Sequence, residues 1–163
     1  MLGRVLIIED EVVLAKWLAR LLGKSFEVVL AHSGQDGIDT WIEQGPFDVV
    51  LCDLMLPVVT GMQIHKKLHS LSPGSEHRIV FMTGGAFTAA IEHFLENITN
   101  PRLEKPFDVP TLLATVERVA QSSPRVTTLA VRSRVVLAWG GRHDEEELLL
   151  PLMALQSTHT LCT

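Results

Sequence analysis

The chain has 163 residues, a net charge of −5 at pH 7 and 47% hydrophobic residues, which is typical of a globular protein. This acidic balance argues against non-specific binding to nucleic acid, which requires cationic side chains. Its apolar runs are shorter than the ~18 residues that a membrane span requires. Only two cysteines are present, and no signal peptide precedes the first apolar segment. We therefore expect a cytoplasmic protein that binds neither nucleic acid nor a membrane.

A polar stretch closed by a proline, Gln121 to Pro124, divides the sequence into two parts. Residues 1–122 contain fifteen acidic and ten basic side chains, whereas residues 123–163 contain four of each, so the net charge belongs to the first part. We predict one domain over 1–122 and a C-terminal extension of unknown role over 123–163. The extension is too short for a usual output domain.

Short apolar runs alternate with segments of helical periodicity along the predicted domain. Strands are predicted at residues 5–8, 26–30, 48–52, 79–82 and 102–104. Helices are predicted at about 14–22, 33–45, 61–71, 88–98 and 109–119. Parallel neighbours need helical crossovers, so five such units imply a doubly wound α/β fold. Its five-stranded parallel sheet would carry helices on both faces.

Charged and hydroxyl side chains follow these strands, at the edge where ligands bind in doubly wound sheets. The residues at the strand ends are Glu9, Asp10, Glu11, Asp53, Thr83, Gly84, Gly85, Lys105 and Pro106. The carboxylates of Glu9, Asp10 and Asp53 offer the oxygen ligands that Mg²⁺ prefers. Lys105 and Thr83 could hold phosphoryl oxygens by charge and by hydroxyl. This set predicts phosphoryl transfer, in which positioning and charge neutralisation supply most of the catalysis.

In their order and spacing, these segments resemble the receiver domain of two-component response regulators. The matching segments are Val5–Glu11, Asp53 with Pro57 and Gly61 after it, Met82–Gly84 and Lys105–Phe107. The resemblance covers about residues 3–122. The segment from Asn100 to Phe107 is most similar to receivers attached to hybrid sensor histidine kinases. This resemblance implies a flavodoxin-like sheet with the strand order 2-1-3-4-5.

The resemblance also implies roles for the acidic residues. Asp53 would be the phosphoacceptor, which receives a phosphoryl group from a phosphohistidine of a sensor histidine kinase or a histidine phosphotransfer protein. Glu9, Asp10, Asp53 and the backbone carbonyl of Met55 would hold Mg²⁺. The chain would catalyse its own phosphorylation and dephosphorylation, and would signal by contact with a downstream protein. The resemblance leaves open whether the chain forms a homodimer.

The resemblance also implies that further residues respond to the phosphoryl group. Thr83 and Gly84 would bind it, Lys105 would pair with it, and the bond between Lys105 and Pro106 would be cis, which X-Pro bonds permit. One position departs from the family. Receivers often carry an aromatic residue three positions before the lysine, and this residue turns inward on phosphorylation, but here the position holds Arg102. We therefore expect output by another mechanism.

Other classes of protein fit parts of the same pattern. A Mg²⁺-dependent phosphatase of the haloacid-dehalogenase type also uses a strand-end aspartate, but it needs a second acid two residues later, where Met55 stands. A pure interaction module would have the fold without the chemistry, and the complete acidic and basic set opposes this. A detached receiver of a hybrid kinase or a phosphorelay is an alternative within the family.

Two histidines four residues apart, His65 and His69, lie on the predicted third helix. This spacing places both imidazoles on one helix face, where a pair could ligate a metal ion. No third ligand stands nearby in the sequence, so we expect a solvent-exposed helix face instead.

Overall fold

The structure of the chain is a computed structural model, and it describes residues 1–85 and 88–122. The elements in chain order are β1 (Arg4–Ile8), α1 (Val12–Leu22), β2 (Glu27–Ala31), α2 (Gly34–Gln44), β3 (Val49–Asp53), α3 (Gly61–Leu71), the 3-10 helix η1 (Ser75–Arg78), β4 (Ile79–Thr83), α4 (Ala89–Glu96), β5 (Arg102–Glu104) and α5 (Val109–Ser122). The predicted extension over 123–163 lies outside the described residues.

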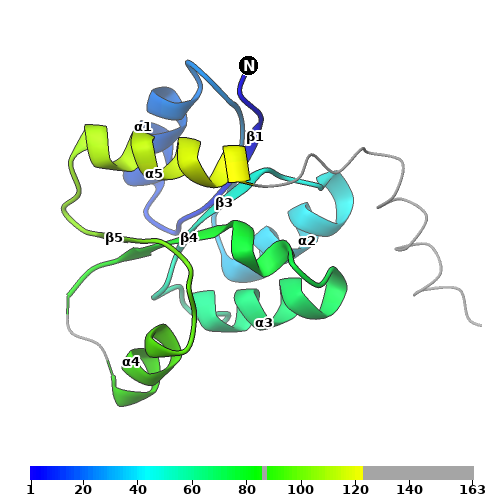
Figure 1. Cartoon of the computed structure of the whole chain (residues 1–163), viewed down its shortest axis with the longest axis vertical. Coiled ribbons are helices and arrows are strands. Elements are labelled where there is room, and N and C mark those ends of the chain that lie inside the picture. Colours follow the sequence, from blue (N-terminus) through cyan, green and yellow to red (C-terminus); the bar gives the residue numbers. More distant parts are fainter. Residues whose placement is uncertain (86–87, 123–163) are drawn as a thin grey trace, which may run out of the picture.

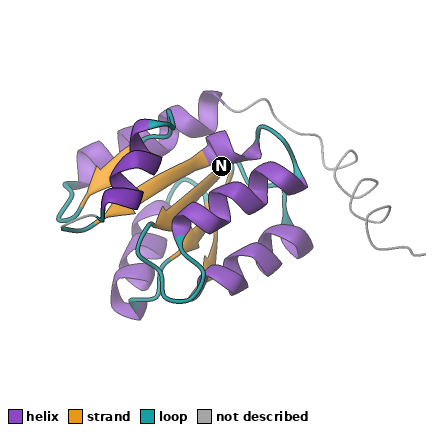
Figure 2. Ribbon diagram, turned by 90° about the horizontal axis from the view of Figure 1, so that it is seen from below, coloured by secondary structure: helices purple, strands orange, loops and turns teal. Residues whose placement is uncertain are grey.

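The five strands form one parallel sheet in the order β2-β1-β3-β4-β5 (Figure 1). Helices cover both of its faces (Figure 2). The predicted doubly wound, flavodoxin-like fold with this strand order is therefore confirmed. The chain runs from β1 outward to β2 and then crosses to β3 on the other side, so the switch point of the topology lies between the carboxyl ends of β1 and β3.

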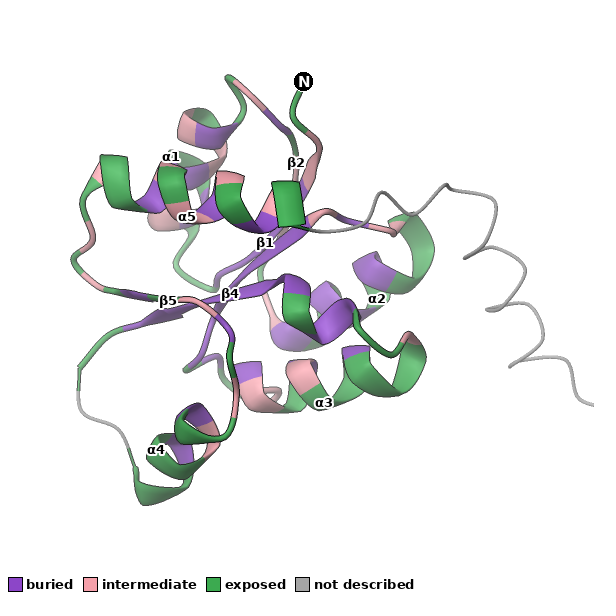
Figure 3. Cartoon of the chain, viewed as in Figure 1, coloured by how far each residue is buried: buried purple, intermediate pink, exposed green. Residues whose placement is uncertain are grey.

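Successive residues of β1 point into two separate cores, one on each face of the sheet. Leu6 and Ile8 pack with side chains of α2, α3 and α4, whereas Val5 and Ile7 pack with side chains of α1 and α5. Figure 3 shows the central strands as buried along their length. Because both faces are covered, these strands are continuous apolar runs rather than alternating ones.

Side-chain caps set where the helices begin. Ser33 Oγ accepts the Asp36 N–H at 3.1 Å, which fixes the start of α2. The predicted end of the fourth helix at residue 98 is wrong by two residues. Asn97 terminates α4, and its side-chain amide donates to His93 O at 2.7 Å.

Among the helices of residues 1–85 and 88–122, none combines the length and the apolar composition needed to cross a membrane.

Candidate functional site

Three carboxylates meet at the switch point of the sheet. Glu9 and Asp10 follow β1 directly, and Asp53 is the last residue of β3, one residue beyond the predicted end of that strand. The two strands are neighbours, with Ile8 opposite Cys52, and this pairing brings their ends together. One oxygen of each acid lies within 4.8 Å of the others. Glu9 and Asp53 are buried, whereas Asp10 is exposed.

Lys105 follows β5, and its side chain reaches past the end of β4 to two of these acids. Its Nζ donates to Asp53 Oδ2 at 2.6 Å and to Glu9 Oε2 at 2.8 Å. Its backbone N–H donates to Thr83 O at 2.6 Å and so continues the pairing between β4 and β5. The Lys105–Pro106 peptide bond is cis. One ammonium group is thus bonded to two acids from separate strands.

Burial and charge act in opposite directions within this cluster. Burial raises the pKa of Glu9; the hydrogen bond from Lys105 lowers it in part, and the charge of Asp53 raises it. Burial by itself would lower the pKa of Lys105, but the hydrogen bonds to Asp53 and Glu9 outweigh this effect and raise that pKa above its ordinary value of 10.5. Lys105 is therefore an ammonium ion at neutral pH, and it offsets the repulsion between the two acids.

Replacing Lys105 with methionine is expected to lower the free energy of unfolding at neutral pH by about 1–3 kcal/mol, because two buried carboxylates lose their counter-charge. In the variant, the pKa of Glu9 rises further above its ordinary value of 4.5. Between pH 4.5 and the raised pKa of Glu9 in the folded variant, the folded state binds more protons than the unfolded state. The free energy of unfolding of the variant therefore falls as the pH rises through this range. The difference in free energy of unfolding between the variant and the wild type is therefore largest at neutral pH and smallest below pH 4.5.

Denaturant unfolding at a series of pH values measures this effect. Lys67→Met is the matched control, because Lys67 is exposed on α3, away from the acids. If Lys105→Met lost the same stability at acid and at neutral pH, the electrostatic role of Lys105 would be contradicted.

Backbone donors hold the second oxygen of each buried acid. The Met55 N–H donates to Asp53 Oδ1 at 2.8 Å, and the Glu11 N–H donates to Glu9 Oε1 at 3.2 Å. Each acid is thereby oriented by the backbone on one side and by Lys105 on the other. An all-oxygen set that includes one exposed acid fits a hard divalent cation such as Mg²⁺, which uses few carboxylates and keeps several waters.

Thr83 and Gly84 lie at the same edge but outside this hydrogen-bonded cluster, whereas Arg102 lies at the amino end of β5, opposite Phe81 in the middle of β4. Thr83 is buried, and its hydroxyl donates to Leu103 O at 3.4 Å, so it faces β5 rather than the acids. Gly84 lies beside the stem of Lys105, where an added Cβ would be 3.6 Å from Lys105 Cδ. Arg102 is exposed at the first position of β5. The Thr83 hydroxyl would have to turn before it could contact a group bound at the acids.

Gly61, the first residue of α3, allows this helix to begin directly against the end of β3. A Cβ at this position would lie 2.9 Å from Leu54 Cα and 3.0 Å from Asp53 O, both backbone atoms. Gly61→Ala is therefore expected to lower the free energy of unfolding by about 1–3 kcal/mol. Thermal unfolding measures this loss. Gly84→Ala is the matched control, because its Cβ would make only ordinary contacts. Equal losses of unfolding free energy for the two variants would contradict steric crowding at Gly61.

The expectation of a solvent-exposed helix face is wrong for His65. Its ring packs edge-on against Phe94 with the centroids 5.3 Å apart, and it lies 6.2 Å from the Phe81 ring. His69 is exposed, but its Nδ1 lies 2.8 Å from Glu76 Oε1. The spacing of the histidines could not reveal this contact, because Glu76 belongs to η1, which only the fold brings to α3.

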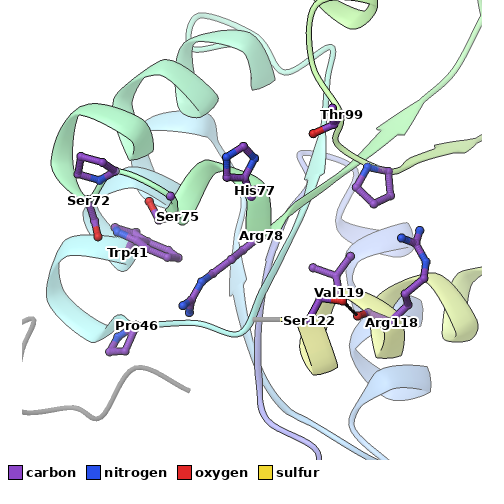
Figure 4. Close-up of a pocket in the computed structure, with 13 residues that line it drawn as sticks. Trp41, Pro46, Ser72, Ser75, His77, Arg78, Thr99, Arg118, Val119 and Ser122 are labelled. Carbon is purple, nitrogen blue, oxygen red and sulfur yellow. Dashed lines mark hydrogen bonds between the residues drawn. The ribbon is translucent and has the colours of Figure 1, made fainter. Parts of the chain in front are cut away.

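A cavity of about 510 Å³ lies at the opposite end of the sheet, beside the segments that lead into β3, β4 and β5 (Figure 4). Trp41 and Val119 form part of its wall. Arg78 extends across it toward Pro46 and donates to Phe47 O at 2.8 Å. No strand-end acid is among the described residues that line this cavity. It is therefore separate from the acidic edge.

The fold and the acidic edge together define an α/β protein with a flavodoxin-like sheet and a cluster of three carboxylates at its switch point. The chain belongs to the response regulator receiver domain family, whose family model matches residues 5–117. It is therefore a receiver domain of two-component signalling, and the resemblance found in the sequence is confirmed.

Curated relatives carry the same domain. The chain is 35% identical over 122 residues to the transcriptional regulatory protein DltR of Streptococcus agalactiae, which covers 74% of this chain and 53% of that protein. It is 29% identical over 123 residues to the response regulator ArlR of Staphylococcus aureus, with 75% and 54% covered. The chain thus spans about half the length of these curated relatives.

Solved structures share the fold. A CheY-like response regulator receiver domain protein from Methanospirillum hungatei is 26% identical with a TM-score of 0.65, covering 74% of this chain and 95% of that one. The receiver domain of a sensor histidine kinase from Pseudomonas aeruginosa, which has a magnesium ion coordinated in its active-site cleft, is 24% identical with a TM-score of 0.64. Here 74% of this chain and 98% of that chain are covered.

Proposed function

We propose that Asp53 is a phosphoacceptor, which takes a phosphoryl group from a phosphohistidine on a sensor histidine kinase or a histidine phosphotransfer protein. The observation that carries this proposal is the position of Lys105 Nζ, 2.6 Å from Asp53 Oδ2 and 2.8 Å from Glu9 Oε2, where three carboxylates meet. A fixed positive charge beside the reacting oxygen stabilises the negative charge of an incoming phosphoryl group.

In the transfer, a carboxylate oxygen of Asp53 forms a bond to phosphorus, the bond between phosphorus and the imidazole nitrogen breaks, and the imidazole leaves with its electron pair. The Met55 N–H holds Asp53 Oδ1 at 2.8 Å, so the aspartate cannot rotate freely. This orientation turns Asp53 Oδ2 toward Lys105. Positioning of this kind, with charge neutralisation, accounts for most catalysis of phosphoryl transfer.

The acidic cluster would hold the cofactor of this reaction. Glu9, Asp10, Asp53 and the backbone carbonyl of Met55 would be the ligands of one Mg²⁺ ion. When bound, the ion supplies charge neutralisation and orients the phosphoryl oxygens. The mutual repulsion of the three acids supports a cation here, because Lys105 contacts only Asp53 and Glu9 and leaves Asp10 without that counter-charge.

After transfer, the phosphoryl group adds negative charge and acceptor oxygens to the end of β3. Lys105 would follow one of these oxygens, and Thr83 would turn from Leu103 O to bind another, next to the backbone of Gly84. This turn would shift the loop that follows β4 and change the surface presented to a downstream protein. Arg102 stands where an aromatic switch residue is common, so we propose that output does not depend on an aromatic rotamer.

The setting of this domain is also part of the proposal. We propose a cytoplasmic receiver that signals by protein contact rather than by binding nucleic acid through this domain, whose charge is acidic. Its likeness to a kinase-attached receiver favours one alternative, a detached receiver of a hybrid kinase or a phosphorelay. A homodimer is compatible with either. A haloacid-dehalogenase-type phosphatase is disfavoured, because the thioether of Met55 cannot act as the second acid.

The test is incubation of the full chain with a small phosphodonor, with and without Mg²⁺, followed by mass spectrometry of its peptides. We expect one phosphoryl group per chain, carried by the peptide that contains Asp53, and little incorporation when a chelator removes Mg²⁺. Phosphorylation on another peptide, or incorporation that is indifferent to chelation, would reject the proposal.

A further inference from the structure

The cavity at the end of the sheet opposite the acidic edge is lined by cationic side chains. Its described lining residues include Arg78, Arg118 and His77, but no aspartate or glutamate. Arg78 and Arg118 extend along its wall from separate elements, η1 and α5 (Figure 4). An arginine side chain stays charged in proteins. The wall is therefore positive, and it favours a negatively charged occupant.

Among these described cations, Arg118 offers its charge to an occupant most directly. Arg78 is buried and feels the opposite charge of Asp48. His77 Nε2 lies 3.4 Å from a carboxylate oxygen of Glu76. Arg118 is exposed, and no carboxylate within residues 1–85 and 88–122 forms an ion pair with its guanidinium.

Much of the remaining wall is apolar and firmly held. Trp41 packs against Phe47 with the ring centroids 5.9 Å apart, and Trp41 and Val119 are only 7% and 6% exposed. Pro46 and Pro101 extend this apolar surface. The volume of about 510 Å³ lies within the range of roughly 300–1,000 Å³ that is usual for ligand pockets. The cavity therefore has room for bulky apolar side chains beside the arginines.

The chain leaves the described part of the domain at this cavity. Ser122, the last described residue, is one of the lining residues, and its hydroxyl donates to Arg118 O at 2.8 Å. Residues 123–163 follow directly. At about 3.3–3.6 Å per extended residue, this length is ample for a later segment to turn back into the cavity. Because such a segment is covalently attached, its docking needs no second molecule.

Charge and composition select one segment of residues 123–163. Four successive acids, Asp144–Glu147, are followed directly by three leucines, Leu148–Leu150. These are the only acids in residues 123–163, and all four arginines of that stretch precede them. The apolar run 135–139 lies between two of the arginines, which the positive wall repels. The acidic and apolar halves of residues 144–150 thus match the two kinds of surface in the cavity.

We propose that residues 144–150 of this chain dock into the cavity between α2, η1 and α5, with the leucines against Trp41 and Val119 and the acids beside Arg118. Docking would remove apolar surface from water and would pair the guanidinium with carboxylates, which bind it through two parallel hydrogen bonds. The segment would lie at the opposite end of the sheet from Asp53 and would leave the acidic edge open. This proposal does not rest on phosphorylation of Asp53.

The test uses Arg118→Lys in the full chain, which keeps the charge of the cavity and introduces an amine. A zero-length carbodiimide joins this amine to a carboxylate in contact with it, and mass spectrometry identifies the coupled peptides. We expect the peptide with position 118 to be coupled to the peptide with Asp144–Glu147. Arg20→Lys, at an exposed arginine of α1 outside the cavity, is the matched control and should not couple to that peptide. Equal coupling in both variants, or none in either, would overturn the proposal.

A second variant separates docking from attachment alone. Adding Leu148→Ser/Leu149→Ser/Leu150→Ser to Arg118→Lys removes the apolar half of the segment but keeps every acid and the length of the connection. The coupling is therefore expected to be lost, and undiminished coupling would show that attachment alone explains it. Coupling between two chains, seen as a covalent dimer on a denaturing gel, would also overturn the proposal, because the occupant would then be a second copy.

Discussion

Replacing Asp53 with asparagine is expected to abolish Mg²⁺-dependent phosphorylation of the chain. The amide oxygen of asparagine carries no negative charge and is a poor nucleophile toward phosphorus, so the step that forms the acyl phosphate cannot occur at this position. The amide keeps the size of the carboxylate, and its oxygen can still accept the Met55 N–H. The fold should therefore persist, and the loss should appear as the absence of the added phosphoryl mass.

Glu104→Gln is the matched control for the loss of one negative charge. Glu104 is exposed on β5 and does not belong to the acidic cluster. This variant is expected to incorporate phosphate at the wild-type level. Wild-type incorporation by the asparagine variant would place the phosphoacceptor elsewhere and would overturn the proposed role of Asp53.

Replacing Phe81 with alanine is expected to lower the free energy of unfolding by about 3–5 kcal/mol, because truncation leaves a cavity in a close-packed core. Phe81 stands in the middle of β4 and is fully buried. Its ring meets the Phe94 ring edge-on at a centroid distance of 5.8 Å, and this contact holds α4 against the sheet. The measurement is the midpoint and slope of unfolding in urea.

Phe81→Leu is the control, because it keeps much of the side-chain volume. It should cost clearly less than the alanine variant, although it also loses the aromatic contact with Phe94, which is worth about 0.5–1.5 kcal/mol beyond the buried area. If both variants lost the same stability, the cavity could not be the cause.

Local pattern in the sequence was sufficient to predict the five strands and the five α-helices in their order, but not the short 3-10 helix η1. The run from Val5 to Ile8 is continuously apolar because this strand is covered on both faces, and the same signal marks the other central strands. The error of two residues at the end of α4 arises from Asn97, whose side-chain amide donates to His93 O, and the predicted bounds also miss two residues at the start of α1 and three at the end of α5. Such a cap depends on one side-chain hydrogen bond, which periodicity does not register.

The candidate site could also be predicted, because its residues follow strands whose carboxyl ends meet by topology. Glu9, Asp10 and Asp53 converge once β1 and β3 are neighbours. The contact of Lys105 with both Glu9 and Asp53 could not be read from the order of the residues. It depends on the path of a long side chain past the end of β4.

The same limit explains the histidines of α3. Spacing along one helix shows that His65 and His69 share a face, but it does not show what packs against that face. In the structure, Phe94 covers His65, and Glu76 meets His69 from another segment. His65 is therefore only partly exposed, whereas His69 is solvent-exposed as expected but also contacts a carboxylate.

Composition, periodicity and strand-end chemistry thus predicted an acidic α/β domain and the acidic residues of its candidate site, because these features are encoded in neighbouring residues and in the topology that they imply. Tertiary packing alone decided that Lys105 joins Glu9 to Asp53, that Thr83 faces Leu103 O, and that His69 meets Glu76. The contacts of Lys105 and Thr83 join segments at least 20 residues apart, whereas His69 and Glu76 belong to the successive elements α3 and η1. Their distances depend on how helices and strands pack together, and no local pattern carries that information.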